Sequence, residues 1–252
     1  MKTPTIVLLA IGASLLLSGG GIGAAPFGVS FPTGWRSFDG PEFSLEPLNA
    51  FSGTSVRYQQ VFQPVAFTGV GGGASAFWVE AMAFRLDATN GTSFSAGLDI
   101  QVNLSTTTRG PDGLSTLFSE NIGTDDTAVY PRDSLPLSVT YLPGFSPQPE
   151  SIRIGFVHPF YYDTNQGNLL LDIRTYRTGN VSFMDAVSVA GDYVSRVWAN
   201  LVSAESGVAD TLGLVTLFSV TPIPEPATWA LLLSGTIFAT VVLRRQANRI
   251  KG

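Results

Sequence analysis

A regular alternation of apolar and polar residues marks the middle of the chain. From Phe94 to Leu104 every second residue is apolar, and the residues between them are small or polar. This pattern predicts a β-strand with one face on a core and the other in water. Asn90-Gly91, just before it, is typical of a tight hairpin turn. We therefore expect Ala76 to Leu86 to be the partner strand, buried on both faces because its apolar residues occupy both parities.

Several other short apolar runs predict strands, and clusters of glycine and proline separate them. No segment between the two ends of the chain shows a convincing helical period. We therefore expect an all-β fold, a single two-sheet sandwich of the jelly-roll kind, whose connection order the pattern does not give. The further strand candidates are Ser55 to Phe62, Ser151 to Val157, Leu169 to Tyr176, Val194 to Leu201 and Leu214 to Val220.

The N-terminus has the outline of a secretory signal peptide. Lys2 precedes an apolar run, Ile6 to Leu17, and small residues follow through Ala25. We predict a signal peptide over residues 1–24 and an exported domain over residues 25–221. The chain contains no cysteine, which excludes a lipoprotein anchor, disulfides and thiolate catalysis by this chain.

The C-terminal residues 222–252 read as a membrane anchor. A proline-rich break leads into the apolar segment 227–243, which ends at Arg244-Arg245. Seventeen residues are near the lower limit for a helix that crosses about 30 Å of hydrocarbon. Basic residues stay on the cytoplasmic side, so Arg244 and Arg245 act as a cytoplasmic stop and the body lies outside. An ordinary C-terminal anchor is the simpler alternative.

This order of elements resembles the PEP-CTERM sorting signal of Gram-negative bacteria, and Pro224, Glu225 and Pro226 carry the resemblance. The resemblance implies that exosortase, a membrane-embedded cysteine transpeptidase, recognises the motif. It also implies that the tail is removed during delivery to the cell surface or matrix, and that the protein is associated with exopolysaccharide and biofilm. The motif is then a substrate of the enzyme, not a catalytic site of this chain.

Short segments of the body are also similar, in sequence and spacing, to a group of PEP-CTERM ectodomains. That resemblance implies an exported β-sandwich of unknown activity and transfers no catalytic residue. The segments are Ala83 to Asp87, Leu104 to Thr108, Pro111 to Ser115, Tyr162-Asp163 and Gly167 to Asp172.

The charge of the body narrows the choice of partners. Between residues 25 and 221 there are nine arginines, no lysine and eighteen acidic residues, a net charge of −9. Nucleic acids and anionic lipid head groups require clustered cations. We therefore expect no nucleic-acid partner and a soluble extracellular body.

Catalytic groups are few. His158 is the single histidine, so a Ser-His-Asp triad would need it as the base. We interpret it as a histidine in a loop at a strand end. Glu80, among Phe77, Trp78 and Phe84, is a candidate for a carboxylate-dependent hydrolase, which needs a second facing acid. Glu80 lying at a sheet edge or pairing with Arg85 is the simpler interpretation, and we predict no catalytic residue.

Calcium is the most plausible ion for this sequence. Zinc is excluded because one histidine and no cysteine cannot form its usual ligand set. Two loops carry hard oxygen ligands, but the simpler interpretation is turn chemistry in which these side chains bond their own backbone. We therefore predict no metal site and no cofactor, with one structural calcium in either loop as the alternative. The two candidate sets are Asn121, Asp125, Asp126 and Asp133, and Asp163, Asn165 and Asn168.

Two aromatic segments suit sugar binding. Phe160 to Asn165 and Trp35 to Asp39 combine aromatic rings with polar side chains, as carbohydrate sites require. Aromatic residues that cap the core of the sandwich are the simpler interpretation.

The sequence therefore predicts a non-catalytic surface or matrix protein, with a carbohydrate-binding module as the alternative and a hydrolase as the third choice. Its expected partners are the secretion translocon, signal peptidase and exosortase, the inner membrane through the C-terminal helix before processing, and matrix polysaccharide.

Overall fold

The computed structural model describes residues 26–49, 54–68 and 73–223. The predicted signal peptide, the motif Pro224-Glu225-Pro226, the apolar segment 227–243 and Arg244-Arg245 lie outside these residues. The α-helix α1 (Val65–Thr68) has four residues, and the described part of the chain contains no helix that could cross a membrane.

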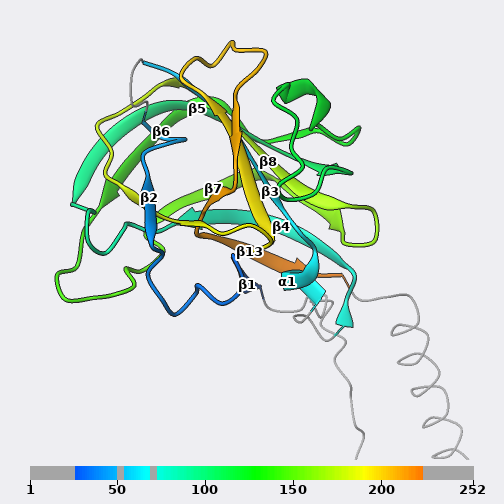
Figure 1. The fold of residues 1–252 in the computed structure, drawn as a ribbon, viewed down its shortest axis with the longest axis horizontal. Helices are drawn as coiled ribbons and strands as arrows, with labels where there is room; N and C mark the ends of the chain where they lie inside the picture. The colour runs from blue at the N-terminus through cyan, green and yellow to red at the C-terminus, as the bar shows by residue number, and fades with distance from the viewer. Residues whose placement is uncertain (1–25, 50–53, 69–72, 224–252) are drawn as a thin grey trace, which may run out of the picture.

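The described residues form an all-β fold, as the sequence predicted (Figure 1). One short 3-10 helix, η2 (Phe118–Glu120), lies between two of its strands. The strands are β1 (Phe27–Phe31), β2 (Glu42–Ser44), β3 (Val56–Phe62), β4 (Ala76–Phe84), β5 (Phe94–Thr107), β6 (Thr127–Val139), β7 (Ile152–Asp163), β8 (Asn168–Arg177), β9 (Met184–Ser188), β10 (Val194–Ala199), β11 (Val208–Asp210), β12 (Leu212–Leu214) and β13 (Thr216–Pro222).

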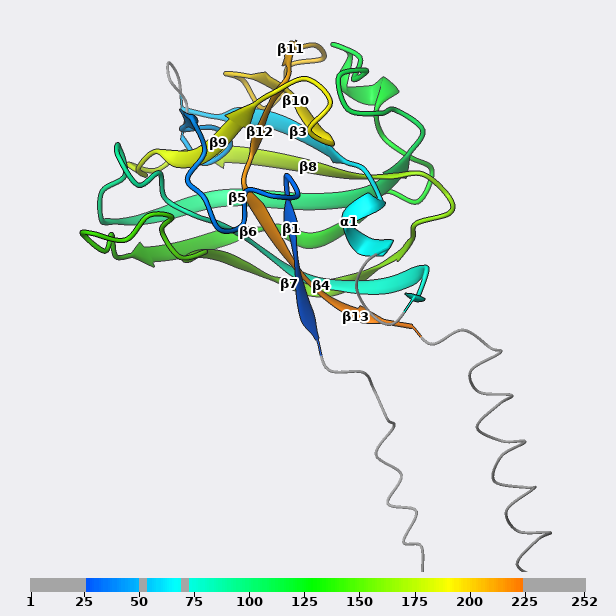
Figure 2. The same ribbon diagram turned by 60° about the horizontal axis from the view of Figure 1, so that its bottom comes forward.

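These strands form three sheets. The largest has the order β11-β10-β3-β8-β5-β6, the second β1-β13-β4-β7, and a small third sheet, which the sequence did not predict, β12-β9-β2. Figure 2 shows β3, β8 and β5 in a layer above β4, β7 and β13. Side chains from both larger sheets form one hydrophobic core, including Tyr58, Ile100, Phe84 and Phe218.

The core face of β5 is confirmed, but the expectation that its other face lies in water is wrong for Asn103 and Ser105, which are buried. Leu98, Ile100, Val102 and Leu104 are fully buried in the core. The residues between them point to the opposite side of the six-stranded sheet because successive side chains of a strand alternate faces.

The predicted hairpin between β4 and β5 is wrong, because the two strands belong to different sheets. β4 pairs with β13 and β7, whereas β5 pairs with β6 and β8. Asn90 lies in a turn that closes on Asp87, whose carboxylate accepts the backbone N–H groups of Thr89 and Asn90. The turn therefore carries the chain from one sheet to the other. The expected double burial of β4 holds from Ala81 to Phe84, but Trp78 is 43% exposed.

β7 is longer than the sequence predicted. The predicted strand ended at Val157, and His158 and the aromatic run after it were expected in a loop. In the structure the strand bulges at this point: Ala81 of β4 pairs with Gly155, and Val79 pairs with Phe160. Because β7 is an edge strand of its sheet, Pro159 removes no ladder hydrogen bond to a further neighbour.

The proline rule also explains a strand that the sequence analysis missed. β6 contains Pro131 and Pro136 and lies at the edge of the six-stranded sheet. An edge strand tolerates proline because one side of its backbone needs no partner strand.

The outer faces of the two larger sheets differ. Residues 108–126 cover part of the six-stranded sheet. Phe118 is fully buried there, with the guanidinium of Arg57 4.6 Å from its ring centroid, and its carbonyl accepts from Gln59 Nε2 at 3.1 Å. The four-stranded sheet leaves Trp78 and Tyr161 exposed on its outer face.

Candidate functional site

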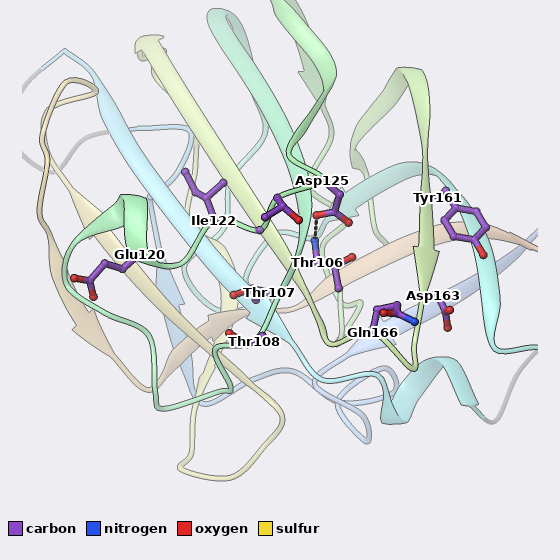
Figure 3. A pocket seen from close by; sticks show the side chains of 11 residues that line it. Thr106, Thr107, Thr108, Glu120, Ile122, Asp125, Tyr161, Asp163 and Gln166 are labelled. Carbon is purple, nitrogen blue, oxygen red and sulfur yellow. Dashed lines mark hydrogen bonds between the residues drawn. The ribbon is translucent and has the colours of Figure 1, made fainter.

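A pocket of about 420 Å³ lies where the ends of β5 and β7 meet residues 120–125 (Figure 3). Thr106, Thr107 and Thr108 line one side, and Tyr161, Asp163 and Gln166 line the other. Its size is within the range of small-molecule sites in proteins.

Two glycines allow the loops to approach the end of β5. A Cβ atom on Gly123 would lie 1.9 Å from the carbonyl oxygen of Thr106. A Cβ on Gly167, whose φ is +150°, would lie 2.6 Å from the carbonyl oxygen of Thr107. Only glycine permits such contacts. The pocket wall therefore depends on these two positions.

Hydrogen bonds position the acidic residues of the pocket. Asp125 accepts the backbone N–H of Thr106 at 2.7 Å, as Figure 3 shows. Arg109 forms an exposed ion pair of 3.0 Å with Glu120. Asp163 accepts the backbone N–H of Asn165 at 2.9 Å. The pocket thus presents three carboxylates whose places are set by local bonds.

Tyr161 supplies an aromatic surface at the pocket. Its side chain is 49% exposed, whereas its neighbours Phe160 and Tyr162 are buried in the core. The ring packs edge-on against Trp78 of β4, with centroids 5.6 Å apart and an interplanar angle of 72°. The exposed face of a half-buried aromatic ring suits the apolar face of a sugar, and the surrounding carboxylate, amide and hydroxyl groups suit sugar hydroxyls.

The structure divides the predicted aromatic segment 160–165. Tyr161 and Asp163 reach the pocket, while Phe160 and Tyr162 serve the core as the simpler interpretation expected. Alternation along β7 is the reason, because residues 160 and 162 share the inner face. The sequence analysis missed Thr106 to Thr108 and Glu120 as pocket residues. No local pattern marks these residues, because they meet the end of β7 only in the folded chain.

The second aromatic segment, Trp35 to Asp39, lies elsewhere. Its backbone carbonyls at Trp35, Arg36 and Phe38 accept hydrogen bonds from the Arg85 guanidinium. Arg36 contributes to a second pocket of about 500 Å³, on the outer face of the four-stranded sheet. The two predicted sugar-binding segments therefore do not form one site.

Glu80 lines this second pocket and accepts a hydrogen bond from the Thr221 hydroxyl at 3.0 Å. Among the described residues that line the pocket it is the single acidic one, so the paired carboxylates of a glycoside hydrolase are not assembled there. Neither simpler interpretation of Glu80 is right, because β4 is an inner strand of its sheet and Arg85 pairs with Asp185.

His158 lies within β7 and not in a loop at a strand end. Its side chain is exposed and forms no hydrogen bond or ion pair with any described residue. The described structure therefore does not bring a serine or a carboxylate to it as a triad would require.

The first predicted calcium set is dispersed among separate partners. Asp125 bonds the backbone of Thr106, and Asp126 bonds the amide of Asn103. Buried Asn121 donates to Gln59 Oε1 at 3.0 Å, and Asp133 accepts from the backbone of Ser134.

The second predicted set closes its own turn. Asp163 accepts from the backbone and the amide of Asn165, whereas Asn168 donates to the carbonyl of Arg109. Turn chemistry therefore accounts for the Asp163–Asn165 bonds, whereas Asn168 holds the distant segment at Arg109.

A buried polar cluster that the sequence analysis did not predict joins β4, β9 and the loop after β1. Oxygen atoms of Asp39, Asp87 and Asp185 lie within 4.8 Å of one another. The fully buried Arg85 contacts Asp185 at 2.5 Å, and Gly40 N–H donates to Asp185 at 2.7 Å. These bonds hold the loop that carries Arg36 against the sheet.

Burial changes the acidity of this cluster. It raises the pKa of the Asp185 carboxyl to about 6, against the opposing effect of Arg85. Burial also raises the pKa of Asp39, and the backbone N–H of Ala88 opposes that rise. Burial outweighs the guanidinium of Arg85, so the Asp185 carboxyl retains a proton more readily than a free aspartate does.

No family model, no curated protein and no solved structure matches the chain.

Proposed function

We propose that this chain is an exported, non-catalytic protein of the cell surface or extracellular matrix, and that its body binds matrix polysaccharide through the pocket at Tyr161. Exosortase processes its C-terminus at Pro224, Glu225 and Pro226. The observation that carries polysaccharide binding is the exposed ring of Tyr161. It packs against Trp78 on one side and borders a pocket with three carboxylates on the other.

The body in this proposal is a two-sheet sandwich of the jelly-roll kind. Strand order supports it. In each larger sheet, four strands form a run of mostly non-consecutive neighbours, β1-β13-β4-β7 and β3-β8-β5-β6. The chain passes between the sheets after β3, β4, β6 and β7, as it does in a jelly roll, a fold that lectin domains use. β10 and β11 extend the six-stranded sheet beyond β3.

The end of the described chain supports processing at the predicted motif. β13 runs to Pro222, and the N–H of Ile223 donates to the carbonyl of Ala76 at 2.8 Å. Pro224 follows directly. A cut after this point leaves all the strand pairing of residues 26–223 in place. Phe27 at the start of β1 is paired with Val220 of β13, so both ends of the body leave from one end of the same sheet (Figure 2).

Affinity electrophoresis tests polysaccharide binding. The protein is purified from the producing cells and run through gels that contain polysaccharide extracted from their matrix. The parent protein is expected to be retarded, and Tyr161→Ala is expected to lose most of the retardation because the stacking surface is gone. Phe145→Ala, which removes a ring that is 60% exposed in another loop, is the control. Equal retardation of Tyr161→Ala and the parent would exclude this pocket.

Intact mass tests the processing. The protein recovered from matrix fractions is expected to end near Pro226, and Pro224→Ala together with Glu225→Ala should leave residues 227–252 attached in the membrane fraction. If the parent protein keeps these residues and stays in the membrane, the tail is an ordinary anchor.

A further inference from the structure

The second pocket forms a hollow on the open outer face of the four-stranded sheet. The hollow forms where three small residues line the sheet surface, namely Ala81 of β4, Gly155 of β7 and Ser219 of β13. These three residues lie side by side, because Ala81 is paired with both Ser219 and Gly155. The floor is therefore built on paired backbone of three strands and not on mobile side chains.

Two arginines border this hollow, one from β7 and one from the loop after β1. Arg153 is exposed and its Nη2 lies 3.3 Å from the hydroxyl of Ser219. Arg36 is also exposed, and its carbonyl accepts from the buried guanidinium of Arg85 at 3.0 Å. The cluster of Arg85 and Asp185 thus fixes the backbone from which the Arg36 side chain extends.

The local charge of the hollow is opposite to that of the body. Its charged lining residues are Arg36, Arg153 and Glu80, and Glu80 already accepts the hydroxyl of Thr221. The body as a whole has two acidic residues for each arginine. Two guanidinium groups at one concave site therefore favour an anion, and the planar guanidinium matches a carboxylate in geometry.

The aromatic pair lies on the same ladder as the hollow, beyond the β-bulge of β7. Trp78 and Tyr161 are opposite each other in the β4–β7 ladder, and Ala81 and Gly155 are the next outward-facing pair beyond the bulge. One strip of the sheet thus carries two aromatic rings and then a hollow with cationic side chains. A chain of sugar rings can lie along such a strip, with one residue at the rings and its neighbour in the hollow.

We propose that this hollow binds the carboxylate of a uronic acid residue in an anionic polysaccharide. Arg36 and Arg153 pair with the carboxylate, Ser219 and Glu80 bond ring hydroxyls, and the Trp78–Tyr161 pair holds the adjacent sugar. This assignment rests on the proposed function for the aromatic pair and adds the class of polysaccharide that the protein selects.

Calorimetric titration tests the charge selectivity. Hexagalacturonate is the anionic probe and maltohexaose the neutral probe of equal length. We expect hexagalacturonate to bind at least about tenfold more tightly than maltohexaose, and Arg36→Gln or Arg153→Gln to weaken it about tenfold each. Arg177→Gln, which removes an exposed arginine at the end of β8, should leave the affinity unchanged. Equal affinity for the two probes would overturn the assignment.

A steric test uses two matched glycines. A Cβ on Gly155 meets nothing within 4 Å, so Gly155→Val keeps the strand and fills the hollow. Gly97 of β5 has the same open surroundings on the other sheet, and Gly97→Val is the control. We expect Gly155→Val to abolish hexagalacturonate binding with an unchanged unfolding midpoint. Binding by Gly155→Val as tight as by the Gly97→Val control would overturn the proposal.

The two proposals can fail separately. If the Tyr161-dependent retardation by matrix polysaccharide persists while the arginine and Gly155 variants bind hexagalacturonate like the parent, the uronate assignment is wrong and the proposed function stands. If neither polysaccharide nor hexagalacturonate binds, both are wrong.

Discussion

The outer faces of the two larger sheets arise from the same alternation along their strands, but one face is covered by a loop and the other is open. On the six-stranded sheet, residues 108–126 cover polar side chains and leave them buried. Gln59, for example, is fully buried and bonds Phe118, Asn121 and Asp172. On the four-stranded sheet, Trp78, Tyr161 and Arg153 remain exposed.

This difference predicts which substitutions change the stability of the fold and which change ligand binding. A buried polar side chain must have partners, because an unpaired one loses its hydrogen bonds to water without replacement. On the covered face, Gln59, Asn121 and the Oδ2 atom of Asp172 are bonded within the protein, while Asp172 Oδ1 has no partner among the described residues. The exposed side chains of the open face keep their hydrogen-bonding capacity for a ligand. Substitutions on the covered face should change the free energy of unfolding, and substitutions on the open face should change binding.

Among these substitutions, removal of the Phe118 ring from the covering segment 108–126 should have the largest effect on the free energy of unfolding. Phe118→Ala leaves a cavity between the sheet and the loop and removes the contact with Arg57. We expect it to lower the free energy of unfolding by about 3–5 kcal/mol in urea titrations. The exposed ring of Phe145 provides the control, because Phe145→Ala empties no buried space. Similar unfolding midpoints for the two variants would show that the cover does not stabilise the fold.

The buried carboxylate beneath the cover comes next. Asp172 is 2% exposed and accepts from Arg57 at 3.1 Å, Arg174 at 3.2 Å and Gln59 at 3.1 Å. Asp172→Asn leaves these donors without a charged acceptor, and we expect a loss of about 2 kcal/mol in the free energy of unfolding. Asp163→Asn, at the pocket, is the matched change on the other face. A larger loss from Asp163→Asn than from Asp172→Asn would reverse the comparison.

The free energy of unfolding should depend on pH through Asp192, which lies in the loop before β10. Burial raises the pKa of Asp192 from 3.8 to about 6, and the Asp112 carboxylate adds to this rise. Because the folded protein holds this proton more tightly than the unfolded chain, its stabilisation is complete below about pH 4 and is lost as the pH rises through 6. Asp185, with a pKa of about 6, acts in the same direction.

The urea midpoint of the parent protein is therefore expected to be higher at about pH 5 than at about pH 7. Asp192→Asn cannot titrate and should reduce this difference, whereas exposed Asp133 replaced by asparagine should not. A parent midpoint that rises with pH over this range would contradict the expectation.

The smallest effect on stability is expected on the open face. Tyr161→Ala removes a half-exposed ring and its edge contact with Trp78, which should cost about 1 kcal/mol. The same variant should lose most of its retardation by matrix polysaccharide. A loss of stability as large as that of Phe118→Ala would show that Tyr161 serves the fold and not a ligand.

Part of the candidate site could be predicted from the sequence. Tyr161 and Asp163 were identified by composition, but the segment was expected in a loop. Pro159 precedes this segment. A bulge in an edge strand accommodates this proline, and the strand continues. The remaining lining residues could not be predicted, because the end of β5 and residues 120–125 meet β7 only in the folded chain.

The sequence by itself determined the all-β class and seven strands, but it did not reveal the other six. The predicted strands are β3, β4, β5, β7, β8, β10 and β13, and the missed ones are β1, β2, β6, β9, β11 and β12. Alternation specifies which face of a strand is buried because the period of a strand is two residues, and the core residues of β5 followed it. The tertiary structure decided which strands pair, and so placed β4 and β5 in different sheets. It also decided which outer face is covered. Backbone hydrogen bonds are the same for any partner strand, so packing of the core, and not local pattern, selects the pairing.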